Sequence, residues 1–388
     1  MANYIWSDAN RFYAATESTY GIPAPIFASN RLAAVRLQCH QALETTIRRD
    51  KTGSRTYQGS ASSATRISNF ELSANLISWD DVTAPCYGPL VQAAMGAPPE
   101  LVQGLTVMAA NGVQIQTQTP HNLSVGSAVS SGGETRFVTL VQDSTTVDIN
   151  VAFLIPPVVG AVLAPAMGYK LATQLPSVSF YDYWDPPNAV SRLITGAGVD
   201  KFQIDVKGDV HSLYFSGPAA DVLDSCSGAF GVSGITSFPA EPVLSTFTYS
   251  IVPGQLGEVW LGSPLNQVFT LTEAAIEIKN NLLVKNQEFG SAYPRAIVPG
   301  PREVTSAFTL FAQADSDTQS LYAAAKARTP VSALLQLGQQ QGQTMAVYLP
   351  NVIPELPLFD DSEVYLFWQF KNNLALGVSN DEAYVAFA

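Results

Sequence analysis

Hydrophobic and polar residues alternate over short segments that are separated by turn residues, a pattern typical of β-strands. The clearest case is a hairpin over 202–215, in which Phe202, Ile204 and Val206 alternate with polar residues before the turn Lys207-Gly208-Asp209. Only two segments in each half have helical character. They include Leu90–Met95 in the first half and Asp317–Arg328 in the second, the latter with an Asp cap at its start and a proline after its end. The pattern predicts a mainly β protein, built from sandwiches or barrels with one helix packed against each half.

A weak internal repeat relates the two halves of the chain. Ala33-Ala34-Val35-Arg36-Leu37 and Phe70-Glu71-Leu72-Ser73-Ala74 return as Ala274-Ala275-Ile276-Glu277-Ile278 and Phe308-Thr309-Leu310-Phe311-Ala312, at spacings of 241 and 238 residues. A chain with two similar β modules closes a ring from half as many subunits, so the repeat favours assembly over chemistry. We therefore predict duplicated inter-subunit strands that contain Val35, Leu37, Phe70, Leu72, Ile276, Ile278, Phe308 and Leu310.

Turn residues and changes of pattern divide the chain into segments. Strand-like runs at 105–107, 113–116, 136–140 and 146–149, separated by Asn-Gly, Gly-Gly and Asp-Ser turns, indicate a small β module inserted into the first half. The predicted organisation is an N-terminal arm (1–30), a first module in two parts (31–103 and 169–217) around the inserted module (104–168), a connector (218–265) and a second module (266–388).

Charged residues are scarce in this chain. They make up 13% of the sequence, against roughly 25% in an ordinary soluble domain. Such a surface is either that of a turn-rich β protein or one that is covered by neighbouring subunits, because interfaces deplete charge at their centres. The 32 acidic residues outnumber the 20 basic ones, for a formal net charge of −12. A negative net charge argues against tight binding of DNA through its phosphates. It suits a surface past which DNA must move, but it is explained equally well as an aid to solubility.

One short segment is basic. Arg48, Arg49, Lys51 and Arg55 form the densest cluster of positive charge in the chain, in a polar stretch that we call the tongue (48–55). It is either a solvated hairpin tip or a contact to an acidic surface on a neighbouring subunit.

Residues with catalytic or metal-binding chemistry are scattered. His40, His121 and His211 lie in different segments, as do Cys39, Cys86 and Cys226, so no metal site, cofactor or disulfide framework is expected, and the thiols suit folding in a reducing cytoplasm. No phosphate-binding glycine loop or nucleophile elbow occurs, and the acid pairs at 80–81, 360–361 and 381–382 are better explained as loop ends than as a hydrolytic site. These patterns give no reason to expect a catalytic residue. The N-terminus does not have the pattern of a signal peptide. Prolines interrupt the longest apolar stretch, 151–167, so we expect no membrane span.

The second half resembles a known family. Its order is the strand Val304–Leu310, a helix through 321–325, the strand Ala333–Leu337, a tight turn, and a strand from Met345 that ends in Leu349-Pro350. This order resembles that of the tail tube (major tail) proteins of long-tailed bacteriophages. The resemblance covers residues about 270–388 well, about 30–100 and 170–217 more loosely, and the inserted module not at all.

The resemblance implies a structural virion protein of the tail, with no enzymatic activity, whose inner strands join those of neighbours into a barrel around a channel. A duplicated chain would form a pseudo-hexameric ring from three copies. These rings would stack into a tube, assembled in the host cytoplasm with other tail proteins, through which genomic DNA passes without specific binding. The tongue would then be a tether that reaches an acidic rim of the ring above or below. Two alternatives stay open: another ring of the same tail, such as a distal tail or terminator protein, and a carbohydrate-binding or hydrolytic β protein.

Overall fold

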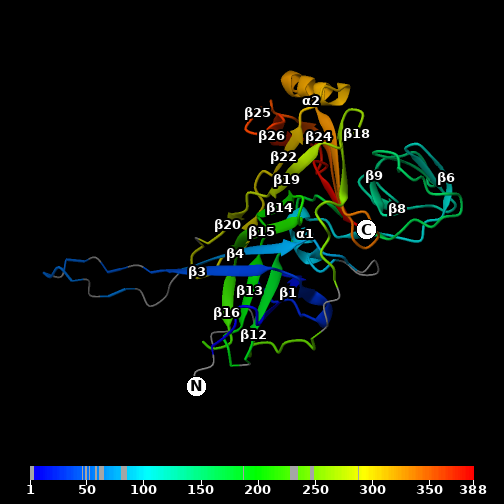
Figure 1. Ribbon diagram of the computed structural model, residues 1–388. Coiled ribbons are helices and arrows are strands. Elements are labelled where there is room, and N and C mark those ends of the chain that lie inside the picture. The colour runs from blue at the N-terminus through cyan, green and yellow to red at the C-terminus, as the bar shows by residue number, and fades with distance from the viewer. Residues whose placement is uncertain are drawn as a thin grey trace.

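The structure of the protein is a computed structural model that describes residues 4–45, 47–48, 50–51, 53–56, 59–60, 65–79, 85–186, 188–227, 235–244, 249–286 and 288–388. Strands dominate it, and two α-helices occur among the described residues, which confirms the predicted mainly β class. A sheet of 15 strands runs through the molecule, and two sheets of five strands accompany it. The inserted module lies to one side of the body (Figure 1).

Eight strands of the long sheet follow one another in the order β3-β4-β15-β14-β19-β22-β26-β25, and we call this run the inner sheet. All its pairs are antiparallel. At its centre β14 pairs with β19, with Lys201 opposite Lys279 and Val206 opposite Ala274, so strands from both halves of the chain share one sheet. The strands are β3 (Arg36–Glu44), β4 (Thr65–Asn75), β14 (Lys201–Val206), β15 (Ser212–Ala219), β19 (Leu271–Lys279), β22 (Glu303–Phe311), β25 (Leu358–Asp360) and β26 (Phe367–Ala375).

A second layer of strands packs against one face of the inner sheet. In the first half it has the order β16-β13-β12-β1-β2, and in the second half the order β18-β17-β23-β24-β27, to which β11 and β5 are added. Its strands are β1 (Asn10–Thr16), β2 (Arg31–Leu32), β5 (Glu100–Val102), β11 (Ala166–Lys170), β12 (Val178–Trp184), β13 (Arg192–Ala197), β16 (Asp221–Asp224), β17 (Gly257–Gly262), β18 (Asn266–Gln267), β23 (Val331–Leu337), β24 (Met345–Ile353) and β27 (Tyr384–Phe387).

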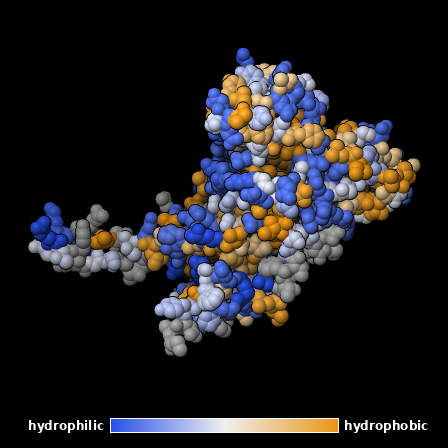
Figure 2. All heavy atoms as spheres, viewed as in Figure 1, coloured by the Kyte–Doolittle hydropathy of each residue, from blue (hydrophilic) through white to orange (hydrophobic). Residues whose placement is uncertain are grey.

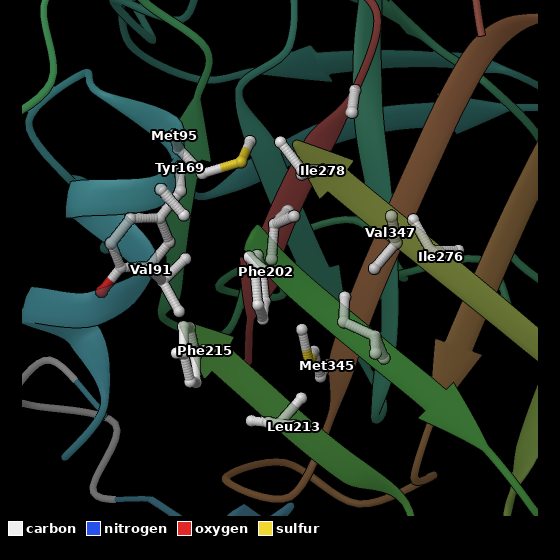
Figure 3. Close-up of a cluster of buried hydrophobic side chains, with 14 of the residues drawn as sticks. Val91, Met95, Tyr169, Phe202, Leu213, Phe215, Ile276, Ile278, Met345 and Val347 are labelled. Atoms are coloured by element: carbon white, nitrogen blue, oxygen red, sulfur yellow. The ribbon is translucent and has the colours of Figure 1, made fainter. Parts of the chain in front are cut away.

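One hydrophobic core lies between the two layers, because alternate residues of each strand point to the same side. Phe202 and Phe215 are fully buried, and their rings stack with centroids 4.7 Å apart. Figure 3 shows them beside Ile276 and Ile278 of β19, with Met345 of β24 from the second layer close by. The predicted 202–215 hairpin and its apolar face are thereby confirmed.

The two helices lie where the sequence predicts them, with one difference at a cap. Helix α1 spans Gly88–Met95, and α2 spans Ser316–Ala327. The N-cap of α2 is Asp315, whose side chain accepts a hydrogen bond of 2.7 Å from the backbone N–H of Thr318, and this bond lowers the pKa of that carboxyl. The prediction of Asp317 as the cap was wrong, because the cap residue needs the extended backbone that Asp315 has, whereas Asp317 already lies in the first helical turn.

The inserted module has a sheet and a hydrophobic core of its own. Its sheet order is β6-β7-β10-β9-β8, and the strands predicted at 113–116, 136–140 and 146–149 are confirmed. The strand predicted at 105–107 was placed too early, because Thr106 forms only an isolated bridge to Val162 and the strand β6 begins at Val107. A further strand, β8, was not predicted, because small polar residues such as Ser130 and Ser131 give little alternation. The strands are β6 (Val107–Asn111), β7 (Gln114–Thr117), β8 (Ala128–Ser131), β9 (Glu134–Val141) and β10 (Thr146–Ile149).

The segments predicted as an arm and a connector contain strands. β1 lies within 1–30 and pairs with β12, while β16 and β17 lie within 218–265. Residues 235–244 pack on the outer face of the first-half second layer, where Arg11 of β1 forms ion pairs of 2.6 Å with both Glu241 and Asp185. Phe238 of this segment contacts Tyr183 edge-on, with ring centroids 5.9 Å apart.

Candidate assembly surfaces

The inner sheet has a polar face on the side away from the core. Glu71 and Ser73 alternate with buried Phe70 and Leu72 in β4, and the other strands follow the same pattern. Charges of both signs lie on this face, and Lys201 and Glu277, from the two central strands, form an ion pair of 2.8 Å. A hydrated wall of mixed sign does not hold a polyanion tightly, because binding DNA requires an excess of cations that displaces its counterions. The residues of this face include Arg36, Gln38, Glu71, Ser73, Lys201, Gln203, Asp205, Tyr214, Glu277, Lys279, Glu303, Thr305 and Gln369.

The inner sheet ends in two open edges. Within the part of the chain that the structure describes, β3 pairs only with β4 and β25 pairs only with β26. Each edge strand therefore presents a row of backbone N–H and C=O groups to a further strand. An edge of this kind is a template for pairing with another chain.

The eight predicted strand residues lie in or beside β3, β4, β19 and β22. Seven of them are at most 5% exposed and belong to the core, whereas Val35 is 66% exposed and precedes β3. Of these four strands, β3 is the one that forms an open edge among the described residues, and β19 lies at the junction of the two halves. Sequence reasoning did not single out β25 as the other edge, because that strand has only three residues and lies between a proline-rich turn and an acidic loop.

The register of the strands differs from that of the sequence repeat. In the second half Phe308 lies opposite Ala274. In the first half Phe70 lies opposite Cys39, which is six residues beyond Ala33, the residue that the repeat matches to Ala274. If β4 is aligned with β22 as the repeat requires, β3 is therefore shifted by six residues relative to its match in β19. Because six is an even number, the shift keeps the same side chains on the core face.

The tongue extends from the open β3 edge. Figure 1 shows β3 running out of the body towards it. The guanidinium of Arg48 pairs with both carboxylate oxygens of Asp50 at 2.6 Å, while Lys51 and Arg55 are exposed. Arg49 lies outside the described residues.

Polar contacts fix the base of the tongue to the body. Gln41 of β3 and Arg66 of β4 both donate to one carboxylate oxygen of buried Asp221, at 2.8 and 3.0 Å. The Arg66 guanidinium also lies over the ring of Tyr293, 4.7 Å from its centroid. The base is thus held by groups from β16 and from the loop 280–302, which contains β20 (Leu283–Val284) and β21 (Ile297–Val298).

A buried ion pair within the inserted module lies at the contact of this module with the second half. Arg136 of β9 is fully buried, pairs with Glu134, and lies over the ring of Trp260 of β17 at 4.4 Å. Gln336 of β23 accepts a hydrogen bond of 2.8 Å from the backbone N–H of Thr135. Burial lowers the pKa of Arg136, and burial together with the Glu134 charge raises the pKa of the neighbouring Glu258 carboxyl. Sequence reasoning missed these residues, since Arg136 and Glu134 occur in an ordinary strand pattern.

The three histidines lie in separate environments. His121 Nδ1 accepts from the backbone N–H of Leu123 at 2.8 Å, and its Nε2 lies 3.0 Å from the carbonyl oxygen of Asp143, as predicted for a turn histidine. His211 is buried, which lowers its pKa, and His40 is exposed. Among the described residues no three His, Cys, Asp or Glu side chains gather where they could hold a metal ion, and no helix is long and apolar enough to cross a bilayer.

Comparison with known protein families gives a match. A family model described as phage tail tube protein matches residues 7–375, which is nearly the whole chain and includes both open edges and the inserted module. A search of curated proteins gives no match.

Proposed function

This chain belongs to the phage tail tube protein family, and from that premise we propose that three copies close a pseudo-hexameric ring and that such rings stack into the tail tube, the conduit for DNA during ejection. The family makes the protein a structural component of the phage tail, which assembles with itself and with other tail proteins. We place this assembly in the host cytoplasm, where the three free cysteines would stay reduced.

Matching strand pairings support a duplication as the origin of the pseudo-symmetry. Every pairing within the first-half set has an antiparallel counterpart in the second half, and α1 packs near β1 as α2 packs near β17. The equivalent elements would be β1 and β17, β2 and β18, β3 and β19, β4 and β22, α1 and α2, β12 and β23, β13 and β24, β14 and β25, β15 and β26, and β16 and β27.

The β14–β19 junction carries the proposal, because it offers a template for ring closure. In the inner sheet, β14 is the edge strand of the first-half strands and β19 is the edge strand of the second-half strands, and the junction pairs these two edges. By the same geometry, β25 of one copy would pair with β3 of the next, and both open edges would be closed. Three copies of the eight-stranded inner sheet, 3 × 8, would then form a barrel of 24 strands.

The polar face of the inner sheet would line the channel in such a barrel. The ring would carry a formal charge of 3 × −12 = −36. A negative ring with a wall of mixed sign repels DNA weakly and does not bind it specifically, which suits passage rather than retention.

Negative-stain electron microscopy and native mass measurement test the proposal. We expect hollow tubes, and from dissociated tubes a ring of 3 × 41.5 kDa, or about 125 kDa, with threefold symmetry. A glycan-binding protein or hydrolase would instead stay small. A compact monomer at high concentration, or a ring of six copies, would contradict the proposed assembly.

The tongue is proposed as the tether between rings. Changing Arg48, Arg49, Lys51 and Arg55 together to Gln should leave rings intact and shorten or abolish tubes, because the positive charge that meets an acidic rim is removed. The measurement is tube length by electron microscopy at several salt concentrations. A control with equal charge loss elsewhere changes Lys285, Arg295, Lys326 and Arg328 to Gln. Tubes of normal length from the tongue variant would refute this role.

A further inference from the structure

The inserted module forms the outermost layer of the chain. Its strands β8 and β9 pack through Ala128 and Phe137 on the face of the second layer that points away from the inner sheet, where Trp260, Tyr348 and Tyr384 lie. Phe137 and Tyr348 stack with ring centroids 5.8 Å apart. The order of layers is therefore the polar face, the inner sheet, the core, the second layer and the inserted module. If the polar face lines a channel, the inserted module lies on the outside of the tube.

The inserted module has almost no surface charge. Residues 104–168 contain four charged side chains, Glu134, Arg136, Asp143 and Asp148, among 65 positions. Glu134 and Arg136 are buried against each other, so only the two aspartates contribute charge to the surface. A surface without charge is expected at the centre of a protein interface.

An exposed apolar segment, 154–162, lies on this module. It has no charged residue, and Figure 2 shows hydrophobic side chains gathered over the module. Soluble proteins seldom expose such contiguous apolar surface unless it binds something. Its exposed residues are Leu154 (52%), Ile155 (75%), Val158 (73%), Val159 (73%) and Val162 (61%).

Hydrogen bonds hold this segment in one conformation. The backbone N–H groups of Leu154 and Ile155 donate to the carboxylate of Glu134 at 2.8 and 3.1 Å, and Glu134 is itself fixed by buried Arg136. Farther along, the N–H of Gly160 donates to the carbonyl of Val107 at 2.8 Å. A preformed apolar surface loses little conformational entropy when a partner binds.

We propose that the segment 154–162 is a contact surface for a second copy of this chain, in the neighbouring ring of the tube. This inference rests on the proposed function. In a stack of rings, each inserted module has the inserted module of another ring above or below it. Within one ring of three copies, the inserted modules are separated by a third of a turn. The contact is of the head-to-tail kind that builds filaments.

Charge and stoichiometry favour a second copy as the partner. Each chain carries a formal charge of −12, so copies repel one another except where their surfaces are uncharged, as the inserted module is. Every copy in the tube carries the segment, and a stack of rings supplies a second copy for each one to meet. Left uncovered in all copies, the segment would make tubes adhere to one another.

Hydroxyl-radical labelling of the full-length chain tests the contact directly. Side chains at 154–162 should be labelled several-fold less in tubes than in dissociated rings, while exposed Val378, in the second half, should be labelled equally in both. In parallel, Val158 and Val159 are both changed to Asp. Because both side chains are exposed, the variant should fold and form rings, but its yield of tubes should fall at least about tenfold. Changing Val158 and Val159 to Ser, which adds no charge, should give an intermediate yield.

A double variant with Val243→Asp and Val378→Asp is the control, since both valines are exposed and lie outside the inserted module. Its tube yield should equal that of the wild type. If wild-type tubes form but the segment is labelled equally in tubes and rings, or if the Asp variant forms tubes normally, this inference is refuted and the proposed function stands. If the wild type forms neither rings nor tubes, both fail together.

Discussion

A chain with Arg136→Ala is expected to lose about 3 to 5 kcal/mol of unfolding free energy, the cost of removing one partner of a buried ion pair. Arg136 is fully buried, and its guanidinium donates to the backbone carbonyl of Thr135 at 3.0 Å while it covers Trp260. Alanine would leave the carboxylate of Glu134 buried without its cation and would open a cavity against the indole. Urea unfolding followed by tryptophan fluorescence measures the loss, because Trp260 lies at the altered contact.

The loss of unfolding free energy in the Arg136→Ala variant should depend on pH. Burial already raises the pKa of Glu258, and the Arg136 charge counteracts that rise, so the pKa should increase further without Arg136. A carboxyl whose pKa is higher in the folded state than in the unfolded state takes up a proton on folding. Its contribution to stability is therefore lost as pH rises through that folded pKa. The difference from the wild type should be larger at pH 7 than at pH 5.

Replacing both Glu134 and Arg136 separates the contribution of their charges to stability from the contribution of packing. The double variant Glu134→Gln with Arg136→Met removes both charges of the pair, so that the Glu258 carboxyl loses the repulsion of Glu134 together with the attraction of Arg136, and it keeps a side chain of similar length over Trp260. It should lose less stability than Arg136→Ala and should show a weaker dependence on pH. A loss below about 1 kcal/mol for Arg136→Ala, or an equal loss at both pH values, would show that buried Arg136 does not stabilise the contact of the inserted module with Trp260.

Local patterns predicted the strands better than their partners. The turn glycines at 112 and 132–133 have positive φ angles, so the hairpins of the inserted module could be inferred from neighbouring residues. The β14–β19 pairing joins segments more than 60 residues apart, and alternation along either strand carries no information about which strand lies beside it. The place of β25 at one edge of the inner sheet was also beyond sequence reasoning, because a strand of three residues does not indicate its neighbours.

The outer contacts were harder still to predict. Tyr13, Tyr181 and Tyr183 form an aromatic face that residues 235–244 cover, but that segment is proline-rich and has no periodicity. Its place is fixed by single contacts such as the Arg11–Glu241 ion pair. The sequence repeat, by contrast, indicated a duplication, and the strand order supports it. The repeat itself matched Ala274 to Ala33, six residues before Cys39, which holds the corresponding place opposite Phe70.

Proline at one of two adjacent positions in β3 should weaken ring formation strongly while leaving the fold intact. Successive residues of an antiparallel strand direct their N–H groups to opposite sides. Of Ala42 and Leu43, one therefore donates towards β4 and the other towards the open edge. Proline removes that donor, so the outward-facing variant loses a hydrogen bond of about 1 kcal/mol at each of three seams, roughly 3 kcal/mol per ring. The ring-forming equilibrium should weaken by about a hundredfold.

The two variants, Ala42→Pro and Leu43→Pro, control for each other. The inward-facing substitution breaks a bond to β4 and should lower the melting temperature, because it acts within one chain, whereas the outward-facing one should leave the melting temperature of the dissociated protein unchanged. Analytical ultracentrifugation measures the rings, and calorimetry measures the stability. One substitution thus tests the side of β3 that pairs with β4, and the other tests the side that forms the open edge. Rings that form normally from both variants would mean that β3 is not the edge at which neighbouring copies meet, and the β14–β19 junction would then not be the template for ring closure.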